Sequence, residues 1–250
     1  GNEKNRRKRL NDLSINWKDF YKNVFSLVVP MALQNLINVG VTAADVVMLG
    51  KVSEKVLSGA SLAGQIQYIM VLFLFGLTSG ATVLTAQYWG KGDKTTIEKI
   101  LALGIRSAVI VTAIFTVAAF AIPASLMRIF TNDPQVIAEG VKYLRIVACS
   151  YIIMGITNVY LYVMRSIERV IVATVVYLVS FLCNVIFNAI FIFGLFGFPA
   201  LGIRGAAIAT LIARIVELIL VCGYAKIYNK DVKFRVHYFL HQDKLLVKDF

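Results

Sequence analysis

A long apolar stretch from Val24 to Leu49 carries a single acid near its end, and this combination constrains the chain more than any other feature. A bilayer core is roughly 30 Å thick, so about 20 apolar residues in a helix that rises ~1.5 Å per residue can span it. The acid is Asp45. An ionisable side chain inside a bilayer costs about 2.5–3.5 kcal/mol on insertion scales, so Asp45 is a functional candidate.

The same stretch holds three side-chain amides, on Gln34, Asn35 and Asn38. A simple anchor helix does not need them. They are either interhelical hydrogen-bonding groups, worth about 0.6 kcal/mol each in membranes, or the lining of a polar cavity. The residues alone leave both interpretations open.

Apolar residues are concentrated in six long runs, and this pattern predicts an all-α integral membrane protein built as a six-helix bundle. The chain has 250 residues, of which 58% are hydrophobic and 16% charged, whereas soluble domains average about 45–50% apolar and 25% charged. Gly76 and Gly80 predict close helix packing on the second run. The predicted spans are Val24–Leu49, Ala60–Ala86, Ile100–Ile122, Val141–Val163, Val170–Gly194 and Gly205–Ala225.

The net charge of +12 raises the question of nucleic-acid binding, but the basic residues lie in the loops and tails. That distribution is typical of membrane insertion, and we expect no nucleic-acid partner. With the N-terminus inside, the inner segments hold 19 Lys and Arg and the outer loops hold 6. We therefore expect a multi-pass plasma-membrane protein with both termini cytoplasmic. Its predicted parts are a basic N-terminal segment (1–23), a transmembrane lobe (24–225) and a cytoplasmic connector (226–250).

Four polar residues from three predicted spans fall at similar depth in the outer half of the membrane. Counting ~1.5 Å per residue, Asp45 lies about 6 Å inside the outer end of its helix, and Asn188 and Thr210 about 9 Å inside theirs. Asn184 is one turn deeper. Carboxylate, amide and hydroxyl oxygens suit a hard monovalent cation. The alternative is a structural network in which a protonated Asp45 donates to an amide.

The sixth predicted span also contains Arg214 and Glu217, three residues apart on one helix face. They could neutralise each other inside the membrane or take part directly in transport. No arrangement of Ser, His, Asp or Cys points to a catalytic site, so we expect neither an enzyme nor a cofactor nor a metal site beyond a coupling cation.

At these residues the sequence resembles the multidrug and toxic compound extrusion (MATE) family of efflux transporters. The first predicted helix, VPMALQNLINVGVTAADVVMLGKV, resembles the first helix of that family, including its acid. TAQYWGKGDK resembles the loop after the second helix, and LYVMRSIERV the loop between the fourth and fifth. CNVIFNAIFIFG followed by GIRGAAIAT resembles the fifth and sixth helices.

The resemblance implies export of cationic or aromatic small molecules by Na⁺- or H⁺-coupled antiport. It places the cation site at Asp45, Asn184 and Thr210, and makes Gln34, Asn38 and Asn158 weaker candidates for the substrate cavity. Many members carry a second acid one turn after the helix-five Asn, where this chain has Asn188. That difference leaves the identity of the coupling ion, Na⁺ or H⁺, open.

The family usually has two six-helix lobes and about twelve helices, whereas this chain has six predicted spans. We expect the amino-terminal lobe, completed by a second lobe from the same gene product or from a dimer mate. Two alternatives remain: a flippase for lipid-linked oligosaccharides or polysaccharides from the same superfamily, and a non-transporting membrane partner. A flippase should have a more basic cavity, and Arg214 is the only cation that the sequence places inside the membrane.

Overall fold

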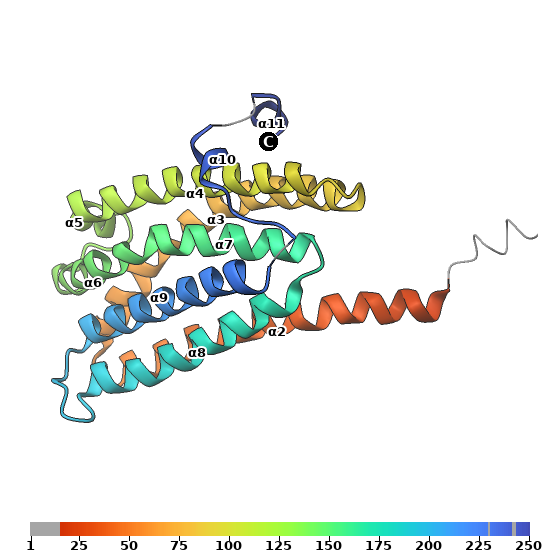
Figure 1. The fold of residues 1–250 in the computed structure, drawn as a ribbon. Coiled ribbons are helices and arrows are strands. Elements are labelled where there is room, and N and C mark those ends of the chain that lie inside the picture. The colour runs from red at the N-terminus through yellow and green to blue at the C-terminus, as the bar shows by residue number, and fades with distance from the viewer. Residues whose placement is uncertain (1–15, 230, 242–243) are drawn as a thin grey trace, which may run out of the picture.

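The computed structural model describes residues 16–229, 231–241 and 244–250, and Figure 1 shows their helices running side by side in one bundle. Much of the predicted N-terminal segment, residues 1–15, lies outside the described part. No strand occurs within the described residues. The helices are α2 (Trp17–Gly50), α3 (Glu54–Gly90), α4 (Lys94–Ala121), α5 (Pro123–Arg128), α6 (Pro134–Val147), the 3₁₀ turn η1 (Ala148–Ser150), α7 (Tyr151–Ser166), α8 (Val170–Phe193), α9 (Ile203–Ile227), α10 (Val236–Leu240) and α11 (Lys244–Asp249).

Within the described residues, six helical units are long and apolar enough to cross a membrane, so the predicted six-helix membrane bundle is confirmed. Most of them extend beyond the predicted apolar runs, because polar residues just outside those runs cap the helices. The side chains of Ser53, Asp93 and Asp133 each accept a hydrogen bond from a backbone N–H in the first turn of α3, α4 and α6. A prediction from hydrophobicity alone leaves out these polar capping residues and therefore makes the helices too short.

The fourth span begins earlier than predicted and contains a change of helix type. It begins at Pro134 rather than Val141 and runs to Ser166. Asp133 caps its start, and Pro134 occupies a first-turn position where its missing N–H costs nothing. A 3₁₀ turn at Ala148–Ser150 joins α6 to α7. Arg165 lies in the last turn of α7, whereas the sequence analysis predicted it in a loop.

Two groups of helices build the bundle. Helix α2 packs mainly on α8, and α8 packs on α9, while α3 packs on α4, α6 and α7. The α8–α9 crossing is close at Gly205, where an added Cβ would lie 2.5 Å from the carbonyl oxygen of Phe191. The prediction of close packing at Gly76 is wrong for the described part of the chain, where a Cβ at this position would meet no atom within 4 Å. Direct contact between α2 and α3 is limited, which leaves room for a cavity between them.

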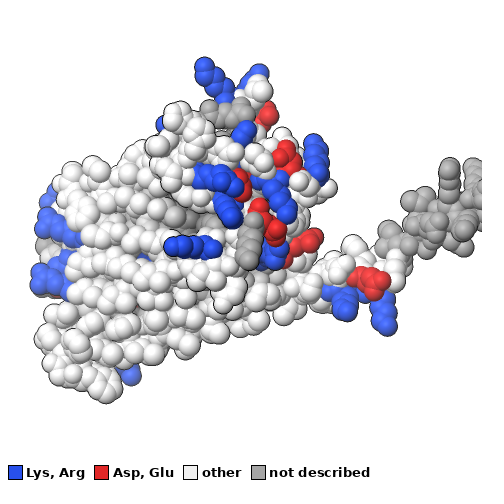
Figure 2. Space-filling view, viewed as in Figure 1, with Lys and Arg blue, Asp and Glu red and all other residues white. Residues whose placement is uncertain are grey.

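The outer surface is largely apolar across the middle of the bundle. Large side chains such as Leu36, Phe73 and Val117 are more than half exposed, as expected for residues that face lipid. Figure 2 shows Lys, Arg, Asp and Glu side chains gathered mainly toward the two ends of the bundle in this view. This distribution matches a protein that spans a bilayer.

The connector after α9 folds back onto the lobe. Asp231 pairs with Lys94 at 3.0 Å and with Arg169 at 2.5 Å, joining the start of α4 to the α7–α8 loop. Lys94, helped by Arg169, holds the pKa of the Asp231 carboxyl below its usual range. Glu98 on α4 accepts hydrogen bonds from Arg235 Nε at 2.7 Å and from the backbone N–H of Lys233. This end of the lobe is therefore tied together by ion pairs.

Candidate ion and substrate site

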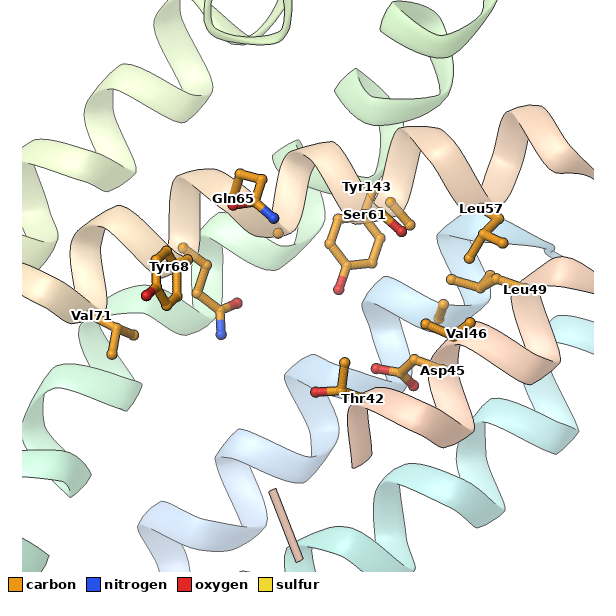
Figure 3. A pocket seen from close by; sticks show the side chains of 14 residues that line it. Thr42, Asp45, Val46, Leu49, Leu57, Ser61, Gln65, Tyr68, Val71 and Tyr143 are labelled. Atoms are coloured by element: carbon orange, nitrogen blue, oxygen red, sulfur yellow. The ribbon is translucent and has the colours of Figure 1, made fainter. Parts of the chain in front are cut away.

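Two adjoining cavities, of about 510 and 420 Å³, open between α2 and α3. They share Thr42 and Asp45 from α2, Gln67, Tyr68 and Val71 from α3, and Tyr143 from α6. We call the two together the central cavity. Figure 3 shows the Asp45 carboxylate and the Tyr143 hydroxyl pointing into the larger part from different helices. Volumes of this size are typical of sites for drug-sized molecules.

Asp45 is held at the wall of the central cavity by an amide from α8. The Nδ2 group of Asn188 donates to the Asp45 carboxylate and also to Asn184 Oδ1, at 3.0 Å. Asn184 in turn donates to Thr210 Oγ1 on α9, at 3.4 Å. Three helices therefore bring the four predicted residues of the ion site into one hydrogen-bonded chain, which we call the Asp45 cluster.

Local sequence explains this meeting. Asn184 and Asn188 are one turn apart, so their side chains stack on the same face of α8. The close approach at Gly205 draws α9 against α8, which puts Thr210 beside Asn184. Tyr143 on α6 adds a hydroxyl that points into the same cavity as Asp45. Tyr143 could not be recognised from the sequence, because a tyrosine in an apolar run is ordinary.

The chemistry of the Asp45 cluster suits a proton or one hard monovalent cation. Asn188 is fully buried, and its Oδ1 has no hydrogen-bond partner in the described structure. Buried polar atoms are normally paired, so this free oxygen marks a place where a ligand would satisfy it. Together with the Asp45 carboxylate and nearby neutral oxygens, it offers the oxygen donors that such a cation prefers.

The smaller of the two cavities, which we call the inner part of the central cavity, carries the second charged group. Arg214 Nη1 donates to both carboxylate oxygens of Glu217, at 2.9 and 3.1 Å, and Glu217 is buried. Both residues line the cavity, as do the predicted candidates Asn38 and Asn158. Within the membrane this pair carries no net charge.

Gln34 lies elsewhere than the sequence suggested. It is fully buried, and neither described cavity has it among its lining residues. Its Nε2 group donates to Thr174 Oγ1 at 2.9 Å and to the carbonyl of Val170 at 3.2 Å. Its Oε1 accepts from Arg165. In this structure Gln34 ties α2 to α8 and holds Arg165 in place.

Arg165 is a cavity residue that the sequence did not predict. It reaches from the last turn of α7 to line the inner part of the cavity, with its guanidinium 4.8 Å from the centroid of the Tyr162 ring. Tyr177 and Ser180 from α8 line the same part. Arg214 is therefore not the only cation at the cavity, because Arg165 lines it as well.

The sequence profile of the MatE family matches residues 30–190, well over half of the chain. The chain belongs to the MatE family. Two of its curated relatives are each named probable multidrug resistance protein NorM. The one from Thermotoga maritima is 28% identical over 78% of this chain and 42% of its own length. The one from Rhizobium meliloti is 27% identical over 84% of this chain and 45% of its own length.

Solved structures show the same fold. An outward-facing multidrug resistance MATE transporter has a TM-score of 0.81 and 20% identity, over 91% of this chain and 50% of its own. A transporter from Pyrococcus furiosus, described as having a binding pocket of reverse polarity, also has a TM-score of 0.81, at 19% identity over the same shares. The chain thus has the fold of one half of a MATE transporter and spans about half the length of its curated relatives.

Proposed function

We propose that this chain is the amino-terminal lobe of a Na⁺- or H⁺-coupled antiporter that exports cationic or aromatic small molecules. The observation that carries the proposal is the Asp45 cluster at the wall of the central cavity. It joins one acid, two amides and a hydroxyl from α2, α8 and α9. The relatives named as multidrug resistance proteins supply the class of substrate.

Coupling follows from competition for one carboxylate. A proton or Na⁺ at Asp45 balances its charge, and departure of that ion leaves a half-buried charge that accepts a hydrogen bond from Asn188. Such a charge favours either rebinding or rearrangement of α2. A ligand shifts a conformational equilibrium only by its differential affinity for the two states, and the ion supplies that difference here.

A second six-helix lobe would complete the transporter, from the same gene product or from a second copy of this chain. The half-length match to the curated relatives supports this part of the proposal. The exposed apolar faces of α2 and α3 border the cavity and give such a lobe a surface to cover. We place the protein in the plasma membrane with both termini of this segment cytoplasmic, on the basis of the Lys and Arg asymmetry.

The flippase alternative is less favoured. The charged residues that line the cavity are Asp45, Glu217, Arg165 and Arg214, and their formal charges cancel. A carrier of phosphate-linked lipids would need an excess of positive charge at the site. A non-transporting partner would not depend on Asp45, and the following experiment tests that.

The test is efflux of tetraphenylphosphonium, an aromatic cation, from proteoliposomes that contain the transporter with this lobe. Na⁺ and H⁺ gradients are imposed separately, with wild type beside Asp45→Asn. Asn keeps the size and hydrogen bonding of the side chain, so the variant should fold but lose gradient-driven efflux. Thr210→Ala should weaken the response more mildly, because it removes one neutral oxygen. If Asp45→Asn responds to either gradient as wild type does, Asp45 is not the coupling residue.

A further inference from the structure

Within the part of the chain that the structure describes, one positive charge in the central cavity, that of Arg165, has no acidic partner. The other cavity cation, Arg214, is neutralised by Glu217. Among the described residues Arg165 has no carboxylate partner. Its guanidinium contacts the neutral oxygen of Gln34 and the ring of Tyr162. Its Nε–H group is buried without an acceptor. A guanidinium carries five donors in a planar fork that fits a carboxylate, so this one is equipped to bind an anionic group.

The position of Arg165 relative to Asp45 can be read along α2. Arg165 is bonded to Gln34, which precedes Asp45 by eleven residues on the same regular helix. Eleven residues are three turns, so Gln34 and Asp45 lie on one face of α2, about 16 Å apart along its axis. The cavity therefore has a negative group at one end and an unpaired positive group at the other.

Aromatic side chains line the space between these two charges. Tyr68 and Tyr143 lie toward Asp45, and Tyr162 and Tyr177 line the part that contains Arg165. Tyrosine rings give contact area for a flat apolar body. Allowing a hydrogen bond of about 3 Å at each end, a ligand that meets both charges would separate its own charges by roughly 10 Å.

We propose that Arg165 is a specificity-determining residue for zwitterionic aromatic substrates, whose carboxylate it binds while their ammonium group faces Asp45. This rests on the proposed function, because it names a substrate class for the same cavity. Arg165 is partly buried and its Nε is already shielded from solvent, so part of the cost of desolvating this partner is incurred before a ligand carboxylate binds.

The experiment compares two probes that differ in one charge. 4′-(Aminomethyl)biphenyl-4-carboxylate has an ammonium and a carboxylate at opposite ends of a flat body, and its methyl ester keeps the ammonium alone. Equilibrium binding of each is measured to the transporter with this lobe, without an ion gradient. Because a hydrogen bond to a charged group is worth more than a neutral one, wild type should bind the acid about tenfold more tightly than the ester.

Substitution of Arg165 should remove that preference. Arg165→Gln should weaken binding of the acid about tenfold and of the ester less than twofold, and Arg165→Lys should restore part of the difference. Arg169→Gln is the matched control, because Arg169 pairs with Asp231 outside the cavity and should leave both affinities unchanged.

Two results would overturn the proposal. One is wild type binding the ester as tightly as the acid, which needs no variant to fold. The other is Arg165→Gln lowering both affinities equally. Gradient-driven efflux of tetraphenylphosphonium is measured separately on the same preparation. If gradient-driven efflux persists but the protein binds the acid no more tightly than the ester, only the proposed role of Arg165 is ruled out. If efflux does not respond to either ion gradient but the protein still binds the acid more tightly than the ester, only the antiport mechanism is ruled out.

Discussion

At the scale of single residues, Asn188 is the hydrogen-bond donor that holds the Asp45 carboxyl in place. Its one amide group donates to both Asp45 and Asn184, so it bridges two acceptors that would otherwise face each other. A carboxylate in its place could not donate when ionised. In the MATE family that this sequence resembles, many members carry an acid at this position. This chain has Asn188 there, and its side-chain amide donates hydrogen bonds.

Asn188→Asp should therefore make the lobe depend on a bound ion. Two ionised carboxylates within hydrogen-bond distance repel, and a cation or a shared proton relieves the repulsion. We expect the unfolding temperature of the detergent-purified protein in Na⁺-free neutral buffer to fall by at least about 4 °C. Added Na⁺ or lower pH should restore it. Asn158→Asp, in the cavity but outside the Asp45 cluster, is the control; equal ion dependence in both variants would contradict this explanation.

Sequence reasoning reached the Asp45 cluster because depth along a helix can be counted. It did not reach Arg165 or Tyr143, for a physical reason. The reach of a long side chain depends on its rotamer and neighbours, so Arg165 looked like a loop residue although it extends into the cavity. The prediction for Gln34 was wrong in the opposite sense, because this residue was expected at the cavity and does not line it. Its amide looked like cavity lining, but its partners lie on the neighbouring helices.

At the scale of helices, the α8–α9 crossing sets the geometry of the ion site. Gly205 permits that crossing, since a Cβ there would lie 2.5 Å from a backbone oxygen of α8. Backbone cannot rotate away as a side chain can, so the helices must separate to admit a methyl group. Such a shift would move Thr210 away from Asn184.

Gly205→Ala should destabilise the lobe by about 1–3 kcal/mol, the usual cost of overpacking. It should also weaken ion-dependent efflux. Gly76→Ala on α3 is the matched control, because its Cβ would meet open space and should be neutral or slightly stabilising. Thermal unfolding in detergent compares the two. Equal unfolding temperatures would show that the α8–α9 crossing tolerates a methyl group.

The helices themselves were predictable to different degrees. Six apolar runs were enough to predict six spans, because the bilayer fixes their length. The glycine pattern was misleading, since the spacing of Gly76 and Gly80 does not say whether another helix lies against that face. The break at Ala148–Ser150 was not visible either, because the sequence there remains apolar and carries no proline.

At the scale of the whole molecule, the distribution of charge predicts orientation. The loop with Phe196, which is 86% exposed, should be outside, and the turn with Lys91 inside. Single cysteines at these positions, in intact cells treated with an impermeant thiol reagent, test this expectation. Phe196→Cys should be labelled and Lys91→Cys should not, and the reverse pattern would invert the topology. Serine first replaces the native cysteines, Cys149, Cys183 and Cys222.

The central claim is that ion and substrate are linked through Asp45. Linkage is reciprocal: if a substrate weakens the binding of the ion, the ion must weaken the binding of the substrate by the same factor. The most direct measurement is the release of Na⁺ or H⁺ from the purified transporter with this lobe when tetraphenylphosphonium is added. We predict release of one of the two ions by wild type and none by Asp45→Asn. Release by the variant equal to that of wild type, or no release of either ion by wild type, would contradict the account.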